Sequence, residues 1–191
     1  LDTGSEASST DYHVWLIKRS DTSVVDVLFS LSVTAPTMPT SYDYRRRIGS
    51  IVRAGAAIVL FTQDGNYFRR SASILDVNAT NPGNSAVTRT LSVPTGLNVQ
   101  ALMNVMLTDT VGNTNTGYLS DLASNDETPS TTAAPLGTFA SEAGGGEGPA
   151  LQVVIRTNTS AQIRSRLRFS GASTVLKIAT LGWTDTRGRD A

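Results

Sequence analysis

The chain has 191 residues, of which only 17% are charged, and its 16 basic and 16 acidic side chains cancel. Proteins that bind nucleic acid by displacing counterions carry a clear basic excess, so this balance argues against nucleic acid as a partner. The absence of cysteine excludes disulfides, thiolate metal sites and cysteine nucleophiles. No apolar run approaches the roughly 20 residues of a membrane span, so no membrane insertion is expected. The chain opens at Leu1 without methionine, as expected of a fragment or processed product with sequence upstream.

The first half of the chain alternates polar and apolar residues with the period of β-strands. Residues 11–20 and 23–32 are two such runs, separated by a turn of the sequence Ser-Asp-Thr-Ser. Asp64 and Gly65 predict a hairpin, because glycine accepts the positive φ of a tight turn. Residues 97–107 place their odd-numbered apolar side chains on one face of a strand, whereas a helix would scatter them around its circumference.

The second half begins with a polar stretch, residues 113–148, whose proline- and glycine-rich parts predict loops. Short strands are expected near residues 118–122 and 136–140, and three longer ones after residue 149. About a dozen short strands without a convincing helix predict an all-β fold, an antiparallel β-sandwich of jelly-roll-like kind. We expect a hairpin-rich segment over residues 1–70, which continues upstream sequence, and a β-sandwich domain over residues 71–191.

The sequence AQIRSRLRFSG, residues 161–171, has arginine at every second position. Arg164, Arg166 and Arg168 therefore share one face of a predicted strand, and Ile163, Leu167 and Phe169 share the other. A solvated strand face is the ordinary interpretation of this pattern. The alternative is a basic stripe that pairs with acidic groups on a neighbouring subunit or on an anionic glycan, so the three arginines are candidate binding residues. Arg45, Arg46 and Arg47 alternate sides and cannot form one patch.

The sequence shows no catalytic constellation, and no enzyme activity is expected. His13 is the only histidine and lies in an apolar run, which predicts a structural role and leaves no ligand set for zinc. A homotrimer that gathers three copies of His13 around an ion is the one metal alternative. The carboxylates of the polar stretch show no spacing that selects a glycosidase pair. We therefore expect neither a cofactor nor a metal site.

The remaining candidate binding residues are Trp183, Asn113 and Asn115. Tryptophan stacks on sugars when its ring is exposed, and Trp183 is near the C-terminal end, whereas Trp15 lies among apolar residues typical of a core. Asn113 and Asn115 belong to the sequence DTVGNTNTG, which predicts a turn and lacks the order of a calcium loop. Loops over residues 113–132 and 140–148 form the expected contact surface, because binding residues concentrate on loops of a rigid scaffold.

Several segments carry a resemblance that spans most of the chain. The order LDTG, YHVWLIKRSDTSVVDVLFS, APTMPTSYDYRRRIGSI and FTQDGNYFRR, together with RTNTSAQIRSR and IATLGWTDTRGRDA, resembles a module recurrent in tailed-bacteriophage and prophage proteins. This resemblance implies a structural virion protein, a fibre or its distal knob, assembled in the bacterial cytoplasm. It carries no catalytic motif and assigns no functional residue.

Three functions remain open from the sequence. The first is a tail-fibre or spike domain that forms a homo-oligomer, with a trimer favoured, and binds a glycan or protein of the host surface. The second is a capsid decoration or head-fibre protein, whose partners are other virion proteins. The third, from a different class, is a glycan-degrading tailspike, which needs a pair of carboxylates in a groove.

Overall fold

A computed structural model describes residues 1–110, 114–132, 136–142 and 146–188, and these residues form fifteen β-strands and no helix. The predicted all-β class is thereby confirmed. The strands are β1 (Tyr12–Arg19), β2 (Val25–Ser30), β3 (Tyr42–Ile51), β4 (Arg53–Ala54), β5 (Ala57–Ile58), β6 (Phe61–Asp64), β7 (Tyr67–Thr80), β8 (Val87–Thr90), β9 (Gln100–Asp109), β10 (Thr116–Ser120), β11 (Phe139–Ala140), β12 (Gly146–Glu147), β13 (Leu151–Arg156), β14 (Gln162–Leu167) and β15 (Thr174–Thr184). In the described ranges, no helix is long and apolar enough to cross a membrane.

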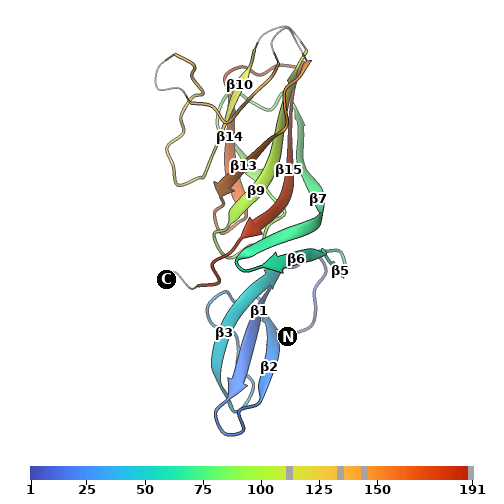
Figure 1. The fold of residues 1–191 in the computed structure, drawn as a ribbon, viewed down its shortest axis with the longest axis vertical. Coiled ribbons are helices and arrows are strands. Elements are labelled where there is room, and N and C mark those ends of the chain that lie inside the picture. Colours follow the sequence, from blue (N-terminus) through green and yellow to red (C-terminus); the bar gives the residue numbers. More distant parts are fainter. Residues whose placement is uncertain (111–113, 133–135, 143–145, 189–191) are drawn as a thin grey trace.

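The molecule is elongated, with a small three-stranded sheet at one end and a sandwich at the other (Figure 1). The three-stranded sheet has the order β2-β1-β3, and we call it the lobe. The sandwich packs a four-stranded sheet, β11-β10-β14-β8, against a six-stranded sheet, β12-β9-β15-β7-β6, whose strand β9 also pairs with β13. The pairings between the described strands are all antiparallel, as the hairpin signals predicted.

The sandwich core follows from the alternation of β9 and β15. Ala101, Met103, Val105 and Leu107 are fully buried, which confirms the predicted inward face of residues 97–107. Leu176 and Ile178 of β15 and Ile163 of β14 complete the centre of the core. Side chains that alternate in this way bury one face of each sheet and leave the other to solvent.

The lobe has a much smaller core. Trp15, Ile17 and Leu28 are buried on one face, with Met38 and Tyr42 packed against them. The structural role predicted for Trp15 is therefore confirmed, and its indole N–H donates to the carbonyl oxygen of Ser32 at 3.2 Å. So few apolar contacts imply that the lobe depends on its junction with the sandwich.

The β6–β7 hairpin forms the junction between the lobe and the sandwich. Its turn has Gly65 at φ 57°, in agreement with the predicted tight turn at Asp64 and Gly65. β7 then runs without interruption from Tyr67 to Thr80 and pairs with β15. The segment boundary expected between residues 70 and 71 thus falls inside this strand, and independent folding of the two segments stays a prediction.

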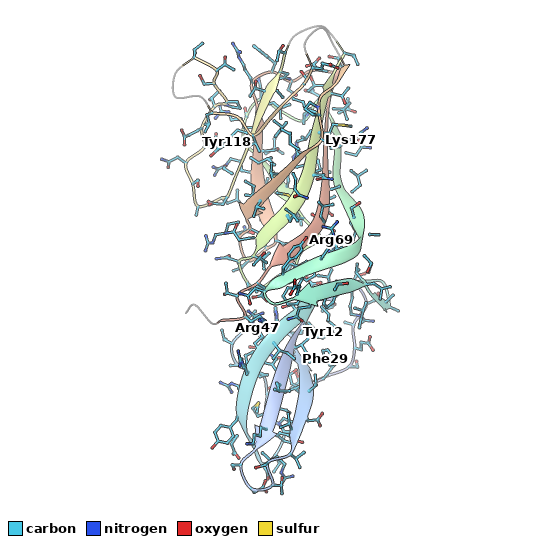
Figure 2. The ribbon with its side chains drawn as sticks, in the orientation of Figure 1. Tyr12, Phe29, Arg47, Arg69, Tyr118 and Lys177 are labelled. Atoms are coloured by element: carbon cyan, nitrogen blue, oxygen red, sulfur yellow. The ribbon has the colours of Figure 1, made fainter. Side chains whose placement is uncertain are left out.

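A buried ion pair also crosses the junction. The guanidinium of Arg47, on β3, donates to both carboxylate oxygens of Asp185 at 2.5 and 2.7 Å. The two side chains are 7% and 2% exposed. Figure 2 shows Arg47 where the lobe meets the sandwich. Because Asp185 directly follows β15, this pair joins the lobe to the central strand of the larger sheet.

Candidate functional site

A polar groove of about 320 Å³ lies on the sandwich beside Tyr118, between β10 and β13. We call it the Tyr118 groove, and Figure 2 shows Tyr118 on the sandwich. Its lining comes from β9, β10, β13 and the loop after β10: Gln100, Tyr118, Leu119, Ser120, Asp121, Ser124, Val154, Ile155 and Arg156. Gln100 and Arg156 are partners in the β9–β13 ladder, so the sheet itself holds two polar side chains at one wall.

The charged groups of the Tyr118 groove are one carboxylate and one guanidinium. Asp121 accepts hydrogen bonds from the backbone N–H and the hydroxyl of Ser124 at 2.7 and 3.0 Å. The backbone N–H of Ser124 is the main cause that lowers the pKa of Asp121, and the nearby Arg156 acts in the same direction. Asp121 is therefore an ionised acceptor at neutral pH, opposite a side chain that only donates.

Arg164 and Arg166 hold the loop after β10 against the outer face of the four-stranded sheet. Arg164 donates to the carbonyl oxygen of Ser124 at 2.9 Å. Arg166 forms an ion pair with Asp126 at 2.7 Å. The acidic partner of Arg166 thus belongs to the same chain, and both arginines hold the loop that forms one wall of the Tyr118 groove.

Arg168 directly follows the end of β14, and its backbone N–H donates to the carbonyl oxygen of Thr116 at 2.8 Å. Its guanidinium lies 5.0 Å from the centre of the Phe169 ring. The expectation that Phe169 shares the buried face of Ile163 and Leu167 is wrong, because Phe169 is 49% exposed. The strand ends at Leu167, and the amide of Asn115 then binds both the N–H and the C=O of Phe169, at 3.1 and 2.8 Å.

Of the two asparagine candidates, Asn113 lies outside the described residues and Asn115 is fully buried. In addition to its bonds to Phe169, Asn115 donates to the carboxylate of Asp109 at 3.2 Å. Ser173 and Thr174 donate to the same carboxylate. Asn115 therefore fastens a loop to the end of the sandwich and presents no free group to a ligand.

Trp183 is 1% exposed, so its ring is not available to stack on a sugar. It stacks on Phe68 with the rings 5° from parallel and 5.3 Å apart, and the Arg70 guanidinium lies 5.5 Å from its centre. A register shift between Thr180 and Gly182 turns Trp183 inward. The same shift brings Gly182 against the backbone of Phe68, where a Cβ would clash.

His13 is part of the polar network under the junction. It is 2% exposed, and its Nδ1 is 2.9 Å from the hydroxyl of Ser50, which lies near Arg47. Burial is the main cause that lowers the pKa of His13 to about 4, the Arg47 guanidinium adds to it, and Asp185 opposes it. A buried, neutral imidazole of this kind is a structural group and is poorly placed to hold an ion on a symmetry axis.

The low pKa of His13 predicts a loss of stability in mild acid. Above pH 6.5, the ordinary pKa, the imidazole is neutral in both states and contributes nothing to the pH dependence. Between pH 6.5 and 4 the unfolded chain binds a proton that the folded chain excludes, so the free energy of unfolding should fall as the pH falls, by about 3 kcal/mol in total. Urea titrations across this range test the prediction. His13→Gln should flatten the slope above pH 5, and an unchanged slope would contradict the assignment.

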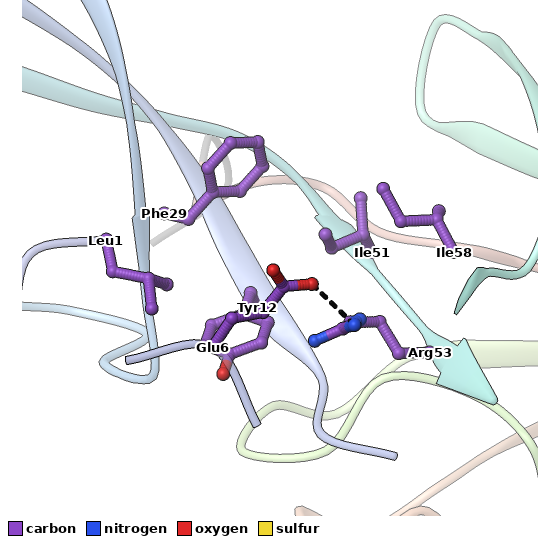
Figure 3. A pocket seen from close by; sticks show the side chains of 7 residues that line it. All are labelled: Leu1, Glu6, Tyr12, Phe29, Ile51, Arg53 and Ile58. Atoms are coloured by element: carbon purple, nitrogen blue, oxygen red, sulfur yellow. Dashed lines mark ion pairs between the residues drawn. The ribbon is translucent and has the colours of Figure 1, made fainter. Parts of the chain in front are cut away.

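An apolar pocket of about 240 Å³ lies on the lobe side of the junction (Figure 3). Leu1, Phe29, Ile51 and Ile58 supply its apolar wall, and the ion pair between Glu6 and Arg53, at 2.5 Å, closes one side. The Arg53 guanidinium also donates to the carbonyl oxygens of Ala7 and Ala56. Glu6, Ala7 and Ala56 thus hold the terminal nitrogens of Arg53, which makes this pocket a weaker candidate for a ligand than the Tyr118 groove.

Sequence reasoning missed Tyr118, Gln100 and Arg156, which come from three strands far apart along the chain. The alternation of Tyr118 with Gly117 and Leu119 predicts that the Tyr118 ring points outward. No pattern in the surrounding sequence indicates that Gln100 and Arg156 lie beside it. Over the residues that the structure describes, no group of three His, Asp or Glu side chains is placed to hold a metal ion.

Comparison of the chain with models of protein families, with curated proteins and with solved structures found no match.

Proposed function

We propose that the chain is a structural, non-catalytic module of a tailed-phage or prophage virion, a tail-fibre or spike domain that oligomerises and binds a glycan of the host surface through the Tyr118 groove. Support comes from the groove itself, which combines a half-buried aromatic ring with ionised and neutral hydrogen-bonding groups on a rigid sandwich. A sugar presents C–H faces that pack on an aromatic ring and hydroxyls that both donate and accept.

The groove chemistry favours binding over hydrolysis. Glycosidases of the common kinds need two carboxyl groups on either side of the scissile bond. Among the residues that line the Tyr118 groove, Asp121 is the one carboxylate, and its lowered pKa makes it a poor proton donor at neutral pH. The groove therefore supports a site that holds a glycan without cleaving it.

The test is binding of the purified chain to polysaccharide extracted from host cells. Tyr118→Ala should weaken binding about tenfold or more, because an aromatic contact worth about 1.5 kcal/mol is lost. Arg156→Ala should also weaken it, whereas Phe169→Ala, a matched change at an exposed ring outside the groove, should not.

Other outcomes would direct the function elsewhere. Binding to capsids alone would favour the capsid decoration or head-fibre alternative. Release of reducing ends from the polysaccharide would identify a glycan-degrading enzyme. Equal binding by Tyr118→Ala and the unchanged chain would remove the groove from the proposal.

A further inference from the structure

One face of the lobe is largely apolar, and its end away from the sandwich is exposed. The ladder pairs place on this face Val14, Leu16 and Lys18 of β1, Val25, Val27 and Phe29 of β2, and Tyr44 and Arg46 of β3, which we call the lobe face. Leu16 is 39% exposed, Val25 53%, Val27 47% and Tyr44 60%. A sheet normally buries its apolar face against a second layer, so the lobe lacks that layer.

The lobe face is exposed toward the free end of the lobe, and at the junction Val14 and Phe29 are half-buried beside the β6–β7 hairpin. A shallow hollow of about 190 Å³ lies between Leu16, Val25 and Tyr44 at the free end. A second hollow, of about 240 Å³, lies between Val14, Phe29 and Phe61 near the sandwich. Contiguous exposed apolar patches of this kind mark surfaces that associate with a partner.

The two outer edges of the lobe carry opposite charges at the same height. Asp26 on β2 and Arg45 on β3 are both register partners of Ile17 on the central strand. Both are exposed, and neither belongs to an ion pair within the described part of the chain. Two strand spacings, about 9–10 Å, separate their backbones, so each is positioned to pair with an edge of another lobe.

The direction of these side chains decides between a pair and a ring of lobes. Asp26 and Arg45 project from the face that carries Ile17, away from the lobe face. In a face-to-face pair they would point in opposite directions and could not meet. In a triangular ring of three lobes, the lobe faces point toward the axis, and the β2 edge of one lobe meets the β3 edge of the next at a corner. The long side chain of Arg45 can reach around this corner to Asp26 of the neighbouring copy.

We propose that three copies of the chain pack their lobe faces around a common axis, with the β2 edge of each lobe beside the β3 edge of the next, so that Asp26 of one copy pairs with Arg45 of its neighbour. This inference rests on the proposed function, in which the module oligomerises, and it names the surface through which the copies associate. Arg46, on the same edge strand, faces the adjoining lobe, and Lys18 lies at the open end, where its ammonium group reaches water.

The experiment is light scattering on the full chain at micromolar concentration after gel filtration. The unchanged chain should have three times the 20.2 kDa of one copy. Asp26→Arg and Arg45→Asp should each raise the dissociation constant about tenfold or more, because each places like charges at the corners. The double variant, with the charges exchanged, should recover the trimer. Glu127→Arg, an equal change of charge on an exposed loop, should leave the mass unchanged.

Several results would overturn the proposal: a monomer or dimer for the unchanged chain, no effect of the single reversals, or no recovery in the double variant. Far-ultraviolet dichroism separates loss of assembly from loss of folding. Glycan binding on the same samples separates this inference from the proposed function. A monomer that binds the glycan removes the ring alone, whereas a trimer that binds no host glycan removes the function and keeps the interface.

Discussion

Replacing Asp185 with asparagine is expected to lower the free energy of unfolding by about 3–5 kcal/mol, since it leaves the buried Arg47 guanidinium without a counter-charge. Asp185 accepts two hydrogen bonds from Arg47 and one from the backbone N–H of Arg187. The loss should be seen in urea unfolding at pH 7. Because the pair joins the lobe to β15, hydrogen exchange should rise first in the lobe strands.

The control for this prediction removes both charges. Arg47→Met combined with Asp185→Leu should recover much of the stability, because well-packed apolar side chains can replace a buried ion pair. Asp21→Asn, which removes the partner of an ion pair on the surface, should change stability little. A loss for Asp185→Asn no greater than for Asp21→Asn would show that the buried pair does not hold the junction together.

Replacing Trp183 with alanine is expected to cost about 3–5 kcal/mol of unfolding free energy, because it leaves a large cavity in the core. The ring contacts Phe68 and Phe61 at centroid distances of 5.3 and 5.9 Å and lies under the Arg70 guanidinium. These side chains come from β6, β7 and β15, so the cavity would weaken the sheet next to the junction. Thermal and urea unfolding of the two proteins measure the effect.

Two further substitutions show whether packing is the cause. Trp183→Phe keeps an aromatic ring on Phe68 and removes an indole N–H that has no hydrogen-bond partner within the described residues, so it should cost less than about 1.5 kcal/mol. Phe169→Ala removes an exposed ring and should cost little. A small effect of Trp183→Ala, comparable with that of Phe169→Ala, would place the ring outside the core.

Local sequence patterns predicted most of the strand architecture, but they did not predict the Tyr118 groove. The alternation of residues 97–107 correctly predicted the buried side of β9 because side chains in a strand point to opposite faces in turn. The same rule failed at Phe169, because β14 ends two residues earlier. The side-chain amide of Asn115 instead forms hydrogen bonds with the backbone N–H and C=O of Phe169. The Tyr118 groove needs residues from β9, β10 and β13 in one place, which no local pattern specifies.

The arginine stripe separates what the sequence determined from what the tertiary structure decided. By itself, the sequence determined an all-β chain, the period of its strands and the shared face of Arg164 and Arg166, because these follow from backbone geometry and the burial of apolar residues. Only the folded chain decided that Arg166 meets Asp126, that Arg47 meets Asp185 and that Trp183 turns inward. Those outcomes depend on which distant segments share a surface and on where one extra residue shifts a strand's register, and neither is encoded in local periodicity.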